Sequence, residues 1–396
     1  MKDMNTKKSR IAKFTVNKKR IEIISAALCS GFCLITVLTL LLILFLPDKE
    51  MSEKENRVLA QKPVFTLSSV ASGKFMKDFE SYLTDQFPCR DKIISLKTFV
   101  DRCVGKKEEN GVLIGKKGYL FENQTEYDKE NVISLTSAIN KFVKKNKTQK
   151  KAFILSPNSS YVLSEYLPTG VAPENQKTQL DKIKKQLDSS VSWIDCAQIL
   201  TSQKDKTELF YRTDHHWKTR AAFLCFESLM KKWNLSPKKT EYMTYSVSDS
   251  FQGTLASSSG VGISTDEIQI CIPTKPKISC VVNFESSNKK TATLFDKDKL
   301  SQKNQYEVFL GGNYDKVIIS TSADTDNTLL LLKDSYANCM IPMLTPFFSK
   351  IVVIDPRYLS DNLSDIMKEY TFTHILFLYN LNTFLADNSL ADTLAS

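Results

Sequence analysis

The sequence predicts an α/β fold in which a buried parallel sheet carries helices on both faces. Apolar runs of four to six residues recur along the second half of the chain, and amphipathic stretches with helical spacing separate them. The composition is ordinary for a globular protein, with 42 % hydrophobic and 25 % charged residues among 396. Wholesale disorder is therefore excluded, and the length allows two or three domains.

The N-terminus predicts a membrane anchor. Residues 23–46 are 24 consecutive uncharged, mostly apolar residues, and as a helix they would span ~36 Å against a hydrocarbon core of ~30 Å. A cleaved signal peptide would have a shorter apolar region, followed by a small-residue cleavage site that is missing here. We expect a signal anchor at 21–47, a basic cytoplasmic tail at 1–20 and, by the positive-inside rule, an extracellular main domain on a single-pass cell-membrane protein.

The net charge of +10 is concentrated in this tail. Residues 1–20 carry eight Lys or Arg and one Asp, which is +7, and residues 21–47 carry one Glu. The rest of the chain is therefore only 10 − 7 + 1 = +4, so nucleic acid is not an expected partner. The nine cysteines include no CxxC pair and there are three histidines, so we expect no metal site. No GxGxxG or Walker A motif occurs, and we expect no cofactor. Cys271 and Cys280 flank an expected hairpin, where they either pair or stay buried separately.

Residues 48–128 are expected to form a linker and membrane-proximal helices. After a polar stretch at 48–70, helical spacing predicts two amphipathic helices broken near Pro88, and 111–121 predicts two short strands around a turn. The α/β domain is expected at 129–396, with a small β-rich insertion at about 237–310. Expected helices are 129–145, 174–188, 218–233, 336–347 and 360–369, and expected strands are 151–156, 192–195, 207–212, 316–320, 328–335, 350–355 and 373–380.

The segment YRTDHHWKT, residues 211–219, is the first candidate for chemistry. Asp214 and His216 are two residues apart, so they point the same way in an extended or tightly turned segment. An imidazole is the usual general base near neutral pH, and a carboxylate on its other nitrogen fixes its tautomer. The alternative is a capped helix start, with Thr213 or Asp214 as N-cap and Trp217 as a core anchor.

The segment LLLLKDSYAN, residues 329–338, is the second candidate. It places Ser335 at a strand-to-helix turn, where backbone amides lie near its oxygen and can form an oxyanion hole. The alternative is again an ordinary helix N-cap. Both segments follow strands, so the two together supply a Ser, a His and an Asp at the carboxyl edge of the sheet.

These motifs resemble a known family. TDHHW resembles the name-giving motif of the bacterial DHHW family, and ENRVLAQKP, FESYLTDQFPCRD and GVLIGKKGYLF occur in the order seen in the wider SGNH-hydrolase-like group, which includes the alginate O-acetylation factors, a group of acetyltransferases. The resemblance implies an SGNH-like fold in which Asp214 and His216 are the catalytic Asp-x-His pair and Ser335 is the nucleophile. Two departures stand out, because Lys333 replaces the Gly of the usual Gly-Asp-Ser and no clear Gly-x-Asn-Asp block supplies an oxyanion hole.

Four further residues are candidate substrate-binding residues. Arg357 and Tyr358 would reach the same sheet edge as Ser335, where they bind a sugar or acyl group or form a surface turn. Asn380 ends the last strand and is a candidate oxyanion or substrate contact. His215 occupies the variable place in the Asp-x-His pair, and we expect its side chain to point away from that pair.

The resemblance implies a membrane-anchored O-acetyltransferase that modifies a cell-envelope polysaccharide through an acyl-serine intermediate. The implied partner is a membrane-bound O-acyltransferase that supplies acetyl groups. A simple carbohydrate esterase, which passes the acyl group to water, is a close alternative. A non-catalytic glycan-binding or scaffold protein of a polysaccharide modification or export complex is the alternative from another class. The test is whether Ser335, His216 and Asp214 converge, with ~3–4 Å between the serine oxygen and the histidine.

Overall fold

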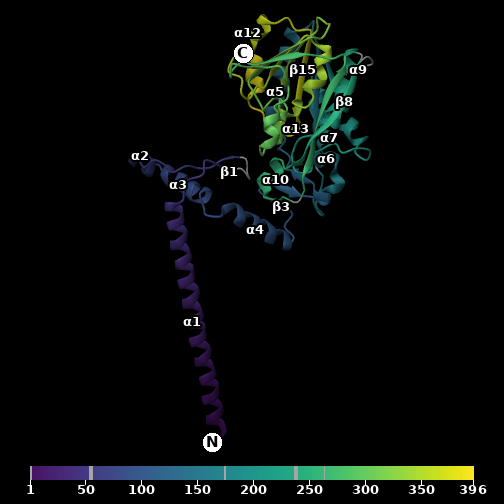
Figure 1. The fold of residues 1–396 in the computed structure, drawn as a ribbon. Coiled ribbons are helices and arrows are strands. Elements are labelled where there is room, and N and C mark those ends of the chain that lie inside the picture. Colours follow the sequence, from purple (N-terminus) through teal and green to yellow (C-terminus); the bar gives the residue numbers. More distant parts are fainter. Residues whose placement is uncertain (1, 53–56, 174, 236–239, 263) are drawn as a thin grey trace. The chain divides into compact units, whose positions relative to one another are not determined.

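The structure is a computed structural model that describes residues 2–52, 57–173, 175–235, 240–262 and 264–396 (Figure 1). The chain forms two compact units, the first ending at Lys97 and the second running from Thr98 to the C-terminus. The second unit thus begins before the expected start of the α/β domain at 129. It includes the small sheet of residues 108–122, which we had assigned to the membrane-proximal segment.

The first unit begins with one long helix, α1 (Lys2–Phe45), drawn in purple in Figure 1. Its stretch Lys18–Ile43 has a mean hydropathy of 2.5 and is long and apolar enough to cross a membrane, which makes it a candidate anchor or signal. The short pair β1 (Met51–Ser52) and β2 (Arg57–Val58) and the helix α2 (Leu67–Ala71) follow. The expected break near Pro88 is confirmed, because α3 (Lys74–Asp85) ends before it and α4 (Arg90–Cys103) starts after it.

The second unit is built on an eight-stranded sheet of order β11-β10-β12-β14-β13-β15-β6-β7. Five neighbouring strands, β14, β13, β15, β6 and β7, are parallel as predicted. The other three run antiparallel to their neighbours, so the sheet is mixed. The strands are β6 (Lys150–Ser156), β7 (Val191–Ile194), β10 (Cys280–Phe284), β11 (Lys289–Thr291), β12 (Lys316–Thr321), β13 (Thr328–Lys333), β14 (Lys350–Ile354) and β15 (His374–Asn380).

Helices cover both faces of this sheet, as predicted. Along β13 the apolar side chains alternate, with Leu329 and Leu331 in one core cluster and Leu330 and Leu332 in the other. The first cluster includes residues of α8 (Cys196–Thr201) and α9 (Thr219–Trp233). The second includes residues of α5 (Lys129–Lys145), α7 (Gln176–Gln186), α12 (Leu363–Glu369), α13 (Leu381–Ala386) and α14 (Leu390–Ala395).

The region expected to hold a small β-rich insertion, at about 237–310, contributes strands to two sheets. The strands β8 (Glu241–Phe251) and β9 (Asp266–Lys275) pair with each other, whereas β10 and β11 extend the main sheet. The expectation of a hairpin between Cys271 and Cys280 is therefore wrong, because these cysteines lie on strands of different sheets. Both thiols are free. A short helix, α10 (Thr254–Ser259), packs on the three-stranded sheet of β3 (Glu108–Glu109), β4 (Val112–Ile114) and β5 (Leu120–Glu122).

Two further expectations differ from the structure. Residues 207–212 form no strand, and Phe210 makes only a single bridge with Trp217. The helix expected at 336–347 is broken into the short turns η6 (Ser335–Ala337), α11 (Ile341–Leu344) and η7 (Thr345–Phe347). Pro342 and Pro346 explain the break, because proline lacks the N–H that a continuous helix needs and favours the first turn of a new one.

Candidate active site

Ser335 lies directly after β13, at the carboxyl edge of the parallel strands. The preceding Asp334 takes the capping role, because its carboxylate accepts hydrogen bonds from the N–H of Tyr336 at 2.9 Å and the N–H of Asn380 at 2.7 Å. The second bond ties this turn to the end of β15. The Ser335 hydroxyl is therefore not used as a helix cap and is available to a partner across the site.

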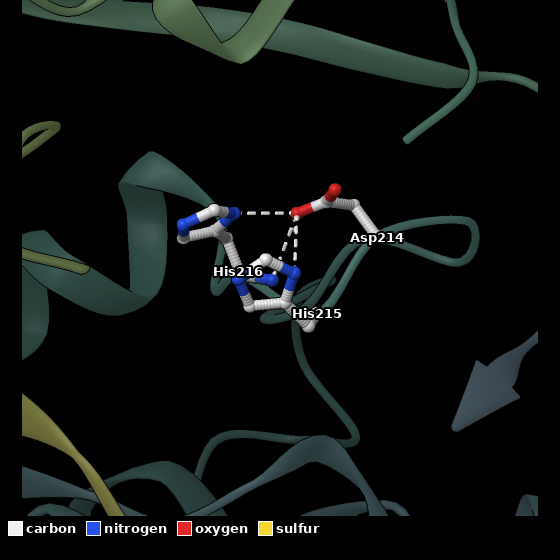
Figure 2. Close-up of side chains that lie close together, drawn as sticks. All are labelled: Asp214, His215 and His216. Atoms are coloured by element: carbon white, nitrogen blue, oxygen red, sulfur yellow. Dashed lines mark hydrogen bonds and ion pairs between the residues drawn. The ribbon is translucent and has the colours of Figure 1, made fainter. Parts of the chain in front are cut away.

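That partner is His216. Its Nε2 lies 2.7 Å from Ser335 Oγ, and its Nδ1 lies 2.6 Å from Asp214 Oδ1 (Figure 2 draws the Asp214 contact). Asp214 and His216 are 1 % and 5 % exposed. The two candidate segments, about 120 residues apart in the sequence, therefore meet in one unbroken hydrogen-bonded chain of carboxylate, imidazole and hydroxyl.

Asp214 is held by a second loop that sequence reasoning missed. Its Oδ1 also accepts from the backbone N–H of His216 at 2.9 Å, and its Oδ2 accepts from the N–H and hydroxyl of Thr254 at 2.8 and 3.1 Å. The neighbouring Gly253 is needed for this approach, since a Cβ there would lie 2.2 Å from Asp214 Cβ. The only local signal was a Gly-Thr pair at a helix start, which is common in any fold.

The surroundings keep the Asp214 carboxyl ionised and the His216 imidazole neutral. Burial alone would raise the pKa of the Asp214 carboxyl, but the two neighbouring histidines and its hydrogen bonds outweigh burial and hold that pKa well below its usual range. Burial lowers the pKa of His216 to about 4, with His215 and Arg357 adding to the effect and Asp214 opposing it. Near neutral pH the imidazole is therefore uncharged, with its proton on Nδ1 toward Asp214 and its Nε2 free to accept from Ser335.

Two rings lie against the His216 imidazole. Tyr306 stacks on it with ring centres 3.8 Å apart and planes 14° apart, and His215 lies against it at 3.9 Å and 36°. The expectation that His215 points away is therefore wrong (Figure 2). The bond from the His216 N–H to Asp214 curls the chain, so side chains do not alternate as they would in an extended segment. His215 Nδ1 instead contacts the Thr254 hydroxyl at 2.8 Å.

Asp214, His215 and His216 bring ligand-type atoms within 4.8 Å of one another, a donor set that some metals accept. Here those atoms are already engaged. Both ring nitrogens of His216 and both Asp214 oxygens have hydrogen-bonding partners. Metal binding would have to break the chain to Ser335, so the cluster fits proton transfer and does not fit a metal site.

Arg357 and Tyr358 follow β14, the strand beside β13. The Arg357 guanidinium donates to both oxygens of the buried Asp355, at 2.8 and 2.6 Å, and lies 5.4 Å from the centre of the Tyr358 ring. Tyr358 is 52 % exposed. β13 and β14 are parallel neighbours with Leu332 opposite Ile354, so both strands end at the same edge of the sheet. Arg357, which follows β14, therefore lies at the same edge as Ser335, which follows β13.

Lys333, the departure from Gly-Asp-Ser, is a buried support. It is 1 % exposed, and its Nζ lies 3.3 Å from Asp355 Oδ2 and 3.1 Å from Asn313 Oδ1. A lysine only donates, so Asn313 must turn its oxygen toward Lys333 and its NH2 group the other way. Asn338 Nδ2 donates to the same oxygen at 3.2 Å.

Asn313 was missed in the sequence, although Gly311-Gly312-Asn313 matches the start of a Gly-x-Asn-Asp block. It lies in the loop before β12. Because β12 runs antiparallel to β14, the start of β12 lies at the edge where β14 ends, with Lys316 opposite Ile354. The Asn313 amide NH2 forms no hydrogen bond within the described part of the chain, which leaves it available at the Ser335 edge.

Asn380 is placed differently from the expectation. It is 2 % exposed and caps α13, accepting from the Asn382 N–H at 2.9 Å and donating to Asn158 Oδ1 at 2.8 Å. Both groups of its side chain are therefore used inside the protein. The arrangement favours a helix cap over a substrate contact.

The fold is of the SGNH hydrolase-like class, and the expected resemblance to the DHHW family is confirmed at the level of the fold. A sequence model described as "SGNH hydrolase-like domain, acetyltransferase AlgX" matches residues 112–311, half of the chain, and the match includes Asp214 and His216. The chain therefore belongs to this AlgX-type family of SGNH hydrolase-like domains.

Solved structures share the fold. A DHHW family protein from Eubacterium siraeum DSM 15702 superposes with a TM-score of 0.61 at 20 % identity, covering 73 % of this chain and 96 % of that one. Bacillus cereus PatB1 with a sulfonyl adduct superposes with a TM-score of 0.58 at 18 % identity, covering 71 % of this chain and 99 % of that one. PatB1 without the adduct matches at 0.57 and 18 %, covering 70 % and 97 %. No curated protein matches the sequence.

Proposed function

We propose that the chain is an O-acetyltransferase that acts on a cell-envelope polysaccharide through an acyl-serine intermediate. The observation that carries the proposal is the chain of contacts from Asp214 through His216 to Ser335, at 2.6 and 2.7 Å. Membership of a family named for an acetyltransferase supports acyl transfer as the reaction class. A serine, a neutral buried imidazole and an anionic carboxylate are the groups that acyl transfer requires.

In the first step Ser335 Oγ attacks the carbonyl carbon of the acyl donor while its proton passes to His216 Nε2. The resulting imidazolium is held by the Asp214 carboxylate. The carbonyl oxygen becomes an oxyanion, for which the Asn313 NH2 and the Ser335 N–H are the proposed donors. The tetrahedral intermediate then collapses, and His216 returns its proton to the departing oxygen of the donor. In the second step His216 takes the proton of the acceptor hydroxyl, whose oxygen attacks the acyl-serine carbonyl. The bond from the carbonyl to Ser335 Oγ then breaks, and His216 returns the proton to that oxygen.

Arg357 and Tyr358 are the proposed contacts of the acceptor. An exposed aromatic ring beside a guanidinium offers a flat apolar face and N–H donors, which together suit a sugar ring and its hydroxyls. His215, 29 % exposed in its side chain, is a third proposed contact of the acceptor. When water takes the place of the sugar, the same groups make the protein a carbohydrate esterase.

We place the site outside the cell. In this proposal the apolar stretch Lys18–Ile43 of α1 crosses the membrane once as an uncleaved anchor, and the basic first part of α1 lies in the cytoplasm. Acetyl donors are scarce outside cells, so a membrane-bound O-acyltransferase is the proposed source of acetyl groups. Protease added to intact cells should degrade the second unit and spare the N-terminus, whereas a soluble, trimmed protein in the medium would contradict this topology.

The catalytic proposal is tested with full-length protein in detergent, p-nitrophenyl acetate and intact-protein mass spectrometry. Ser335→Ala and His216→Ala should each remove nearly all acylation, and the double variant should be little worse, because residues that act as a unit are non-additive. The exposed Ser320 on β12 provides a matched control, and Ser320→Ala should react normally. Since PatB1 was solved with a sulfonyl adduct, a sulfonyl fluoride should also add to wild type and not to Ser335→Ala.

Several outcomes would overturn the proposal. Unchanged turnover in Ser335→Ala would leave that serine without a catalytic role. Loss in His215→Ala with retention in His216→Ala would identify the other histidine as the base. If wild type reacts with no ester and Ser335→Ala cells still acetylate their polysaccharide, a non-catalytic glycan-binding or scaffold role replaces the enzyme.

A further inference from the structure

Tyr306 touches both the proposed base and the proposed nucleophile, although it lies on neither of their loops. It belongs to the short helix η5 (Gln305–Val308) and is buried. Its ring stacks on the His216 imidazole with centres 3.8 Å apart, and its hydroxyl donates to the backbone oxygen of Ser335 at 3.2 Å. One side chain therefore connects the two reacting groups from outside the Asp214–His216–Ser335 chain.

The stack has a particular geometry. The two ring planes are nearly parallel, at 14°, so the π-face of the tyrosine covers the face of the imidazole. The other contacts of His216 act in its plane, where Asp214 binds Nδ1 and Ser335 binds Nε2. Because Tyr306 and His215 both lie against the His216 ring, it can neither flip nor tilt without losing contacts.

This stacked geometry matters when the His216 ring becomes positively charged. During acylation the His216 ring gains a proton and a positive charge in a site that excludes water. Asp214 stabilises that charge at one edge, and an electron-rich aromatic face at 3.8 Å stabilises it from above by a cation–π interaction. The neutral ring gains much less from the same contact, so the benefit falls mainly on the transition state.

We propose that Tyr306 is a positioning residue for acylation, which favours the charged form of His216 through its π-face and fixes Ser335 through its hydroxyl. The inference rests on the proposed function, because it concerns the same proton transfer. It adds to the Asp214–His216–Ser335 chain a side chain that comes from the segment expected to be a β-rich insertion.

The test changes the electrons of the ring while keeping its shape. Tyr306→Phe removes only the hydroxyl and should slow acylation by p-nitrophenyl acetate by less than about fivefold, the value of one neutral hydrogen bond. Pentafluorophenylalanine at position 306, which reverses the charge pattern of the ring face, should slow acylation by roughly a further 10- to 30-fold, as expected for a desolvated cation–π contact. A partly fluorinated ring should fall between the two.

Phe309 provides the matched control, because its ring lies 5.2 Å from Tyr306 and is buried in the same cluster without lying on His216. Pentafluorophenylalanine at 309 should change packing by a similar amount and leave the acylation rate within about twofold. A purely structural role for Tyr306 would make the two fluorinated variants alike. Thermal melting of each variant separates loss of folding from loss of rate.

The outcomes distinguish this inference from the proposed function. If Ser335→Ala abolishes acylation and fluorination at 306 changes nothing relative to Tyr306→Phe, only the role of Tyr306 is wrong. If Ser335→Ala acylates normally, the proposed function fails first. If the fluorinated 306 variant does not fold, Tyr306→Phe and the partly fluorinated ring still decide, because equal rates in those two would overturn the proposal.

Discussion

Replacing Asp214 with Asn tests the site most sharply, because all four groups that hydrogen-bond to its carboxylate are donors. Its two oxygens accept from His216 Nδ1, the His216 N–H, the Thr254 N–H and the Thr254 hydroxyl, at 2.6 to 3.1 Å. An asparagine keeps the shape but replaces one oxygen with an NH2 donor. Whichever way the amide turns, this donor faces a backbone N–H that cannot rotate away.

Each orientation of the introduced amide has its own consequence. With its NH2 toward Thr254, the hydrogen bond to His216 survives but the negative charge that stabilises the imidazolium is gone. With its NH2 toward His216, Nδ1 must become an acceptor, so Nε2 carries the proton and cannot take one from Ser335. We expect acylation to fall roughly 10³- to 10⁴-fold, as a wrong-tautomer substitution does in serine hydrolases, and the free energy of unfolding to fall by about 1–3 kcal/mol.

The assay combines acylation by p-nitrophenyl acetate with urea unfolding. Asp266→Asn is the matched control, because this buried carboxylate accepts from the Arg212 and Thr213 N–H groups and the Thr213 hydroxyl, at 2.6 to 2.9 Å, without touching His216. It should lose similar stability and much less rate. The reasoning is refuted if Asp214→Asn acylates within tenfold of wild type, or if Asp266→Asn slows acylation equally.

Two further predictions follow from the same contacts. Gly253→Ala should slow acylation about 10²-fold, because the new Cβ pushes the Asp214 carboxylate aside. Gly262→Ala is the control and should react normally, because its Cβ would lie 3.4 Å from the nearest atom, Gln252 Nε2. Equal rates for the two variants would contradict the need for glycine at 253. Burial, aided by Lys150, lowers the pKa of His374 to about 4 against ~6.5 when unfolded, so the unfolded chain binds more protons and stability should fall as pH drops from ~6.5 toward 4. Urea unfolding measures this at pH 7 and pH 4.5. Between these pH values the free energy of unfolding of His374→Leu should fall by about 2–3 kcal/mol less than that of wild type. An equal fall in both proteins would argue against a buried neutral His374.

The sequence predicted the features that local pattern controls. Uninterrupted apolar residues marked the second half of α1 and the central strands, and the helical spacing on either side of Pro88 marked α3 and α4. The candidate residues Asp214, His216 and Ser335 were also found in this way. Ser335 directly follows an apolar strand, and the carboxyl ends of parallel strands meet at one edge whatever the rest of the chain does.

The order and direction of the outer strands did not follow from local pattern. β12 joins the main sheet by pairing antiparallel with β14, and β10 and β11 are then added in turn beyond β12. These pairings join segments far apart along the chain, so the pattern within each strand does not specify them. The short turns at 335–347 likewise depended on two prolines within a segment of otherwise helical spacing.

Tertiary structure alone decided which residues surround the reacting groups. Gly253 and Thr254 meet Asp214 from 40 residues away, Tyr306 meets His216 from 90, and Asn313 meets Lys333 from 20. Each is an ordinary residue in its own neighbourhood, because a stacked ring or an oriented amide leaves no periodicity and no spacing along the chain. Their roles arise from loops that packing brings to one edge of the sheet, and a contact of that kind is a property of the folded chain rather than of any segment of it.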